Sequence, residues 1–134
     1  MARVLITEQL AQRGIDLLRN AGHDVDVRLG LSPAELEGAI ADADALIIRS
    51  ATQVTKEVLA AAKSLQVVGR AGVGLDNVDT EAATANGVIV ANAPTSNSVS
   101  AAEHTMAMLL AVARNVPQAP VSYTHLTLPT KRIV

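Results

Sequence analysis

The sequence contains no cysteine, tryptophan or phenylalanine, and its aromatic content is only 1 %. Without cysteine the chain can form no disulfide, no thiolate metal site and no thiol nucleophile. Without large aromatic side chains, its hydrophobic core must be built from valine, leucine, isoleucine and alanine. Such a core is typical of a parallel α/β fold, in which β-branched strands are covered by alanine- and leucine-rich helices.

Long apolar runs and a large net charge are also absent. The apolar run at 106–113 is too short to cross a bilayer, and the run at 4–6 is too short for a secretion signal. The formal net charge of −2 gives no indication of nucleic-acid binding. The histidines show no metal-ligand spacing, and His23 is expected to be solvated on an edge strand. We therefore expect a cytoplasmic protein that binds neither membranes, nucleic acid nor metal.

Strand and helix patterns alternate five times along the chain. Strands are expected at 3–7, 23–28, 45–48, 65–69 and 88–91, and helices at 8–20, 32–40, 55–63, 78–85 and 100–116. The fully apolar segment at 45–48 predicts a central strand, and the alternating segment at 23–28 predicts an edge strand. This order predicts a flavodoxin-like, doubly wound, five-stranded parallel sheet. The last helix is apolar nearly all round, so we expect it to be buried on several sides as the start of something larger.

Three glycines, Gly69, Gly72 and Gly74, follow the fourth predicted strand. Their spacing is not the dinucleotide fingerprint G-x-G-x-x-G, and Leu75-Asp76 stands where a P-loop needs lysine and serine or threonine. Asp76, Asn77 and Asp79 offer caps for the next helix. Two interpretations remain open: a turn that needs positive φ, or a turn whose backbone N–H groups bind an anion.

Polar loops follow three of the predicted strands, and ligands bind beyond the carboxyl ends of such strands. These loops are Arg49-Ser50, the glycine turn, and the segment 92–98, which contains Asn97. Arg49 would supply a fixed charge, Ser50 and Asn97 neutral hydrogen bonds, and the glycine turn its N–H groups. This set predicts a site for a small ligand with carboxylate or phosphate groups. The alternative for Arg49 is a salt bridge to a neighbouring acid.

The segments 69–79, 87–94 and 97–105 resemble, in this order, the NAD-dependent D-2-hydroxyacid dehydrogenases. The segment 45–52 is typical of members that act on 3-phosphoglycerate. The resemblance covers residues 1 to about 119. It implies that residues 1–98 form part of a substrate-binding domain, and that 99–119 form the inter-domain helix and the start of a Rossmann domain that is otherwise missing. The tail, 120–134, is not family-like, and we expect it to be non-native.

The resemblance also implies roles for individual residues. Arg49 and Ser50 would meet the phosphate end of a small anionic substrate such as 3-phosphoglycerate. The amides of Val73 and Gly74 would hold its carboxylate, and Asn97 would be another substrate contact. Val73 would also approach the nicotinamide of NAD. The helix from Ser100 would contribute to a contact between copies in a homo-oligomer.

Other expected family residues have no match in this sequence. These are the dinucleotide fingerprint and the catalytic arginine, glutamate and histidine, so we assign no catalytic residue and expect the chain alone to be inactive. The alternatives are a glyoxylate or hydroxypyruvate reductase type of the same family, or a non-catalytic receiver-type module. The receiver module needs aspartates after its first and third strands, where this chain has Thr7-Glu8 and Arg49-Ser50.

Overall fold

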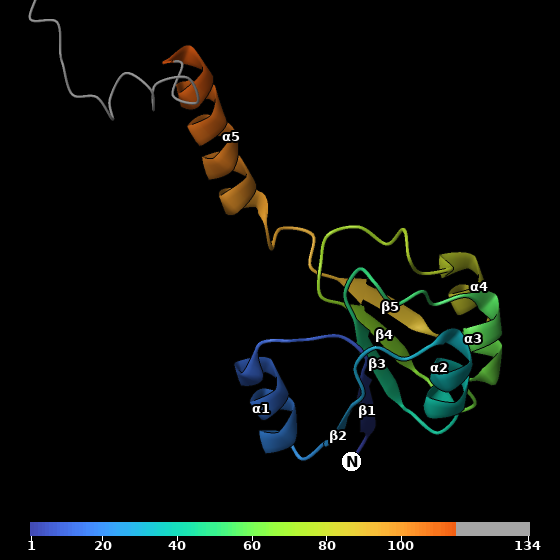
Figure 1. The fold of residues 1–134 in the computed structure, drawn as a ribbon. Helices are drawn as coiled ribbons and strands as arrows, with labels where there is room; N and C mark the ends of the chain where they lie inside the picture. The colour runs from blue at the N-terminus through green and yellow to red at the C-terminus, as the bar shows by residue number, and fades with distance from the viewer. Residues whose placement is uncertain (115–134) are drawn as a thin grey trace, which may run out of the picture. The chain divides into compact units, whose positions relative to one another are not determined.

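The computed structural model describes residues 1–114, which contain a five-stranded parallel sheet of strand order β2-β1-β3-β4-β5 (Figure 1). The strands are β1 (Arg3–Ile6), β2 (Asp24–Val27), β3 (Ala45–Ile48), β4 (Val67–Arg70) and β5 (Ile89–Asn92). The helices are α1 (Gln12–Asn20), α2 (Pro33–Ile40), α3 (Lys56–Ala61), α4 (Thr80–Ala85) and α5 (Ser98–Ala113). This strand order confirms the flavodoxin-like prediction, with β2 at an edge and β3 in the centre.

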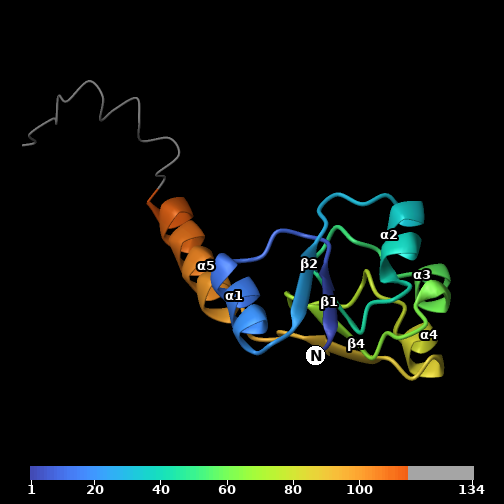
Figure 2. The same cartoon turned by 90° about the horizontal axis from the view of Figure 1, so that it is seen from below.

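The two faces of the sheet are covered unequally. Helices α2, α3 and α4 lie on one face and α1 lies on the other, as the two views show (Figures 1 and 2). The larger core cluster includes Leu5, Leu46 and Val68, which are fully buried under α2, α3 and α4. The smaller one joins Val4 and Ile6 to Ile15 of α1. Successive strand residues alternate between these cores because side chains of a strand point to opposite faces.

Local signals explain where α2, α3 and α4 begin. Ser32 and Glu35 form the predicted capping box of α2, with Pro33 in the first turn. The side chains of Thr55 and Asp79 accept hydrogen bonds at the N-termini of α3 and α4. Such caps satisfy backbone donors that have no partner inside a helix.

Several predicted helix boundaries were wrong, including the end of α5, which lies at Ala113 rather than at 116. Helix α1 begins at Gln12 rather than at residue 8, because the Glu8 carboxylate is bound to a distant loop. Helix α3 ends at Ala61, two residues early. Helix α5 begins at Ser98 with Asn97 at the N-cap position, and the Ser100 hydroxyl donates to the Asn97 carbonyl at 3.1 Å from within the first turn.

Residues from Asn97 onward form a unit separate from Met1–Ser96, and we describe it by itself. Within the described part of the chain, no residue of α5 is buried, so the expected cover over this helix is not provided there. None of the helices described is long and apolar enough to cross a membrane. The predicted tail at 120–134 and the last residues of the predicted 99–119 segment lie outside the described residues.

Candidate anion-binding site

The carboxyl ends of three neighbouring strands meet at one edge of the sheet. Ile48 of β3 pairs with Arg70 of β4, which pairs with Asn92 of β5. The loops that follow these residues therefore start side by side, as the sequence predicted. The Asn92 side chain reinforces this arrangement by donating to the Val73 carbonyl at 2.6 Å. Asn97 belongs to the second unit and is not placed relative to the site.

The loop after β3 has its backbone N–H groups directed at a single carboxylate, that of Glu8. Glu8 Oε1 accepts from the amides of Arg49 at 2.8 Å and Thr52 at 2.9 Å. Glu8 Oε2 accepts from those of Ser50 at 3.2 Å and Ala51 at 3.1 Å. Burial of the carboxyl opposes its ionisation, but the backbone N–H groups outweigh that effect and lower the pKa of Glu8 below its usual value.

The side chains of Arg49 and Ser50 in this loop are exposed. Within residues 1–114, Arg49 forms no ion pair, so the predicted alternative of a salt bridge is wrong for this part of the chain. The Ser50 hydroxyl likewise has no partner among those residues. Both groups are therefore available to a ligand.

The carbonyl groups of the same loop are bound from the other side by Asn77. Its Nδ2 donates to the carbonyls of Arg49 at 2.9 Å and Thr52 at 2.7 Å. Arg70 Nε donates to the Arg49 carbonyl at 3.1 Å and to Asn77 Oδ1 at 2.9 Å. Asn77 is 3 % exposed. The sequence indicated Asn77 only as a possible helix cap, and Arg70 was missed, because neither forms a recognisable motif.

The glycine turn is explained by close packing rather than by positive φ. The glycines with positive φ are Gly22, Gly30 and Gly87, so that interpretation of the turn was wrong. A Cβ atom on Gly72 would lie 2.8 Å from Arg70 Nη1, and one on Gly74 would lie 2.7 Å from Asp76 Oδ1. Glycine is therefore needed at these two positions because the Arg70 and Asp76 side chains pack closely against the backbone of the turn.

The N–H groups of Val73 and Gly74 donate to no other residue in the described range. Val73 and Gly74 are both exposed residues. Their amides do not fit the pyrophosphate of a dinucleotide such as NAD, because the turn lacks the glycine spacing of a dinucleotide-binding loop.

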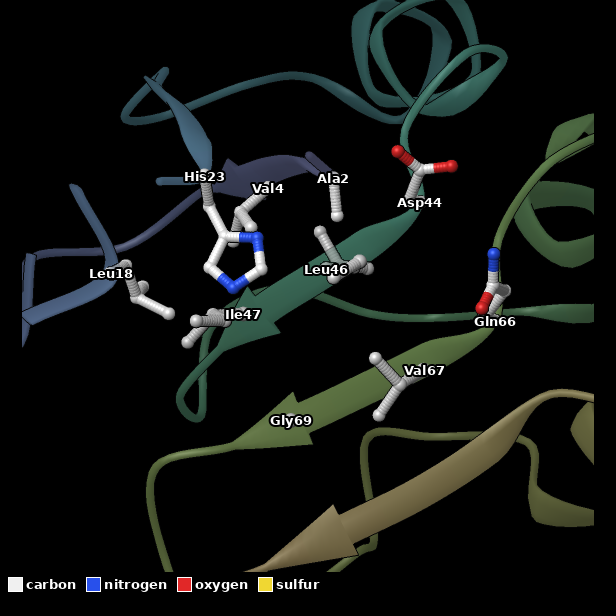
Figure 3. Close-up of a pocket in the computed structure, with 11 residues that line it drawn as sticks. Ala2, Val4, Leu18, His23, Asp44, Leu46, Ile47, Gln66, Val67 and Gly69 are labelled. Atoms are coloured by element: carbon white, nitrogen blue, oxygen red, sulfur yellow. The ribbon is translucent and has the colours of Figure 1, made fainter. Parts of the chain in front are cut away.

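A cavity of about 340 Å³ lies elsewhere, on the face of the sheet that α1 covers (Figure 3). Figure 3 shows the His23 ring among Val4, Leu18 and Ile47. His23 is half-buried, and its Nδ1 is buried without a partner in the described chain, so the prediction that it is solvated was wrong. The cavity wall is mainly apolar and includes neither Arg49, Ser50, Val73 nor Gly74, so the loop edge is the better candidate.

Residues 4–130 match the model of the D-isomer specific 2-hydroxyacid dehydrogenase catalytic domain. The chain is 57 % identical over 121 residues to D-3-phosphoglycerate dehydrogenase 2, chloroplastic, of Arabidopsis thaliana, covering 90 % of this chain and 19 % of the relative. The fold resembles the TT0316 protein of Thermus thermophilus, with 38 % identity, a TM-score of 0.79, and coverage of 92 % and 40 % of the two chains.

It also resembles the NAD+-bound 3-phosphoglycerate dehydrogenase of Entamoeba histolytica, with 26 % identity and a TM-score of 0.72. That likeness covers 82 % of this chain and 38 % of the other. The chain spans about a fifth of the length of the curated relatives that it matches.

Proposed function

Because this chain belongs to the D-isomer specific 2-hydroxyacid dehydrogenase family, we propose that it is the substrate-binding part of a D-3-phosphoglycerate dehydrogenase. The whole enzyme would oxidise 3-phospho-D-glycerate to 3-phosphohydroxypyruvate with NAD, in serine biosynthesis. The observation that carries this proposal is a pair of neighbouring loops: within residues 1–114, the Arg49 side chain of one loop and the Val73 and Gly74 amides of the other have no partner. Relatives named D-3-phosphoglycerate dehydrogenase, such as that of Methanocaldococcus jannaschii at 50 % identity, support the choice of substrate.

The two ends of the substrate would be held by different chemistry. The Arg49 guanidinium offers a planar fork of donors to the phosphate, and the Ser50 hydroxyl adds a neutral hydrogen bond. The amides of Val73 and Gly74 would hold the carboxylate, with Asn97 as a further substrate contact. The proposed contact of this chain with NAD is limited to the backbone of Val73.

The proposal includes inactivity of the chain alone. A hydroxyl can be oxidised only if a general acid–base group exchanges its proton, and the matching histidine, arginine and glutamate are absent from this sequence. We further propose that two copies associate through α5, and that the protein is cytoplasmic. The Arabidopsis relative is named as a chloroplastic protein, which makes the chloroplast the alternative location.

Amide-resolved NMR titration of the chain tests the binding proposal. With 3-phosphoglycerate we expect shifts at the amides of 49–52 and at Val73 and Gly74, and with D-glycerate shifts only at the latter two. The Arg49→Gln variant should lose the phosphate-dependent shifts, whereas Arg13→Gln, the same change on the exposed surface of α1, should keep them. Equal affinity for D-glycerate and 3-phosphoglycerate would favour the reductase alternative. Formation of NADH by the purified chain would contradict its proposed inactivity.

A further inference from the structure

Four consecutive backbone N–H groups converging on one acceptor form an anion-binding nest. In this chain the nest at 49–52 is filled by the side chain of Glu8, at distances of 2.8 to 3.2 Å. A nest filled by the protein's own carboxylate cannot offer these amides to a ligand. Recognition of a phosphate at this loop therefore falls to the side chains of Arg49 and Ser50.

The position of Glu8 is determined by the sheet. Ile6 pairs with Ile47 in the parallel register of β1 and β3, and the Thr7 amide donates to the Ile47 carbonyl at 3.2 Å. The buried hydroxyl of Thr7 lies 2.9 Å from that of Thr52. Glu8 thus leaves β1 directly beside the start of the loop after β3, and its side chain reaches the whole loop.

Both the N–H groups and the carbonyl groups of the loop at 49–52 are hydrogen-bonded. Glu8 accepts from its N–H groups, and Asn77 donates to its carbonyls at Arg49 and Thr52. Of the polar side chains of this loop, only those of Arg49 and Ser50 have no partner among the residues described.

We infer that Glu8 is a positioning residue that determines specificity for the phosphorylated substrate, by holding the loop at 49–52 in the form that presents Arg49 and Ser50. This inference rests on the proposed function. It concerns only the phosphate end of the ligand, because the hydrogen bonds that the Glu8 side chain accepts come from the amides of the loop at 49–52.

Because Glu8 is negatively charged, the direction in which its replacement changes the affinity for an anion tests the inference. Removing a negative charge beside an anion site by itself strengthens anion binding. If Glu8 instead acts by positioning, removing the charge weakens binding, because a glutamine places an NH2 donor against backbone donors.

The first experiment is amide hydrogen exchange of the wild-type chain and of Glu8→Gln. We expect faster exchange at 49–52 in the variant and unchanged exchange in β4 and β5. A charge-matched control is Glu81→Gln, at an exposed position of α4. Asp44→Asn is a stability control, because Asp44 accepts from the Arg3 amide at 2.7 Å at the opposite end of β3. Unchanged exchange at 49–52 in Glu8→Gln would overturn the inference.

The second experiment measures dissociation constants for 3-phosphoglycerate and D-glycerate with the same variants. Glu8→Gln should bind 3-phosphoglycerate about tenfold more weakly while D-glycerate binding stays unchanged. Tighter binding of 3-phosphoglycerate, or an equal loss for both ligands, would overturn the specificity role. If the wild-type chain binds neither ligand, the proposed function fails, while the exchange experiment still decides the positioning role.

A variant that does not fold is replaced by Glu8→Asp. Its shorter side chain keeps the charge but cannot reach all four amides, so the same selective loss of phosphate binding is expected. Wild-type affinity and exchange in Glu8→Asp would overturn the inference.

Discussion

The side-chain amide of Asn77 donates a 2.9 Å hydrogen bond to the carbonyl oxygen of Arg49, and this bond joins the segment after β4 to the loop after β3. Asn77 is buried and also bonds to Thr52 and Arg70, so all of its side-chain polar atoms have partners. Such an amide costs little when satisfied, but its removal takes away three hydrogen bonds and leaves the Thr52 carbonyl without a partner among the residues described.

We therefore expect Asn77→Ala to lower the free energy of unfolding by about 3 kcal/mol. Urea denaturation measures this loss. The matched control is Asn86→Ala, because Asn86 is exposed and, within residues 1–114, its side chain donates only to the Ala82 carbonyl in α4. That change should cost less than about 1 kcal/mol. Similar losses in the two variants would contradict the role assigned to Asn77.

The glycine turn gives a prediction about the order of two substitutions. A Cβ on Gly72 meets Arg70, whose side chain is 10 % exposed and fixed by two hydrogen bonds through Nε. A Cβ on Gly74 meets Asp76, whose side chain is 83 % exposed and can move away. Gly72→Ala should therefore destabilise the chain by about 1–3 kcal/mol, and Gly74→Ala by less.

A double-mutant cycle tests whether contact with Asp76 causes the loss of stability in Gly74→Ala. In an Asp76→Ala background, the cost of Gly74→Ala should fall toward zero, because the contacted oxygen is gone. Gly69→Ala is the control for a neighbouring glycine with space, since the nearest atom to its Cβ would be Ile47 Cγ1 at 3.9 Å. A larger loss for Gly74→Ala than for Gly72→Ala would show that this packing argument is wrong.

The lowered pKa of Glu8 predicts a pH dependence of stability. Because the carboxylate is stabilised in the folded chain, its contribution is present above its usual value of 4.5 and is lost as the pH falls through the lower folded value. The difference in unfolding free energy between wild type and Glu8→Gln should thus be constant near neutral pH and shrink below about pH 4.5. Asp26 and Glu35 also have lowered pKa values, but their effects cancel in this difference. If this difference in unfolding free energy instead grows on acidification, the backbone N–H groups of 49–52 do not stabilise the Glu8 carboxylate.

The architecture of the sheet could be predicted because its signals are local. The apolar segment of β3, the capping box at Ser32 and the cap at Asp79 each determine an element within a few residues. The start of α1 was predicted wrongly because a side chain there acts at a distance. Glu8 looks like the first residue of a helix, yet it binds a loop more than forty positions away.

The candidate site was predictable only in part for the same reason. Parallel strands bring their carboxyl ends together, so the neighbouring loops at Arg49 and Gly72 followed from topology. The side chains that brace these loops, Arg70 and Asn77, carry no motif and depend on tertiary contacts. The exposure of His23 was predicted wrongly because it depends on the packing of α1 against the sheet. The alternation of polar and apolar residues at 23–28 carries no information about that packing.

Helix α5 gives a prediction about association. Its exposed apolar residues lie on several sides and include Met106, Met108, Leu109, Leu110 and Val112. An amphipathic surface helix would carry polar groups on its solvent side, and a contiguous apolar surface of this kind favours contact with another protein surface. If two copies associate through α5, the wild-type chain should have a mass above that of a monomer in light scattering coupled to size-exclusion chromatography.

Leu109→Glu should shift that mass toward the monomer, because burying a carboxylate in an apolar contact is costly. Leu17→Glu is the matched control: Leu17 of α1 is 62 % exposed and Leu109 is 60 % exposed, so the two changes add the same charge at equally accessible positions. Association that persists in Leu109→Glu but is lost in Leu17→Glu would move the contact from α5 to α1. A wild-type chain that is monomeric at all concentrations would show that the apolar surface of α5 does not bind a second copy.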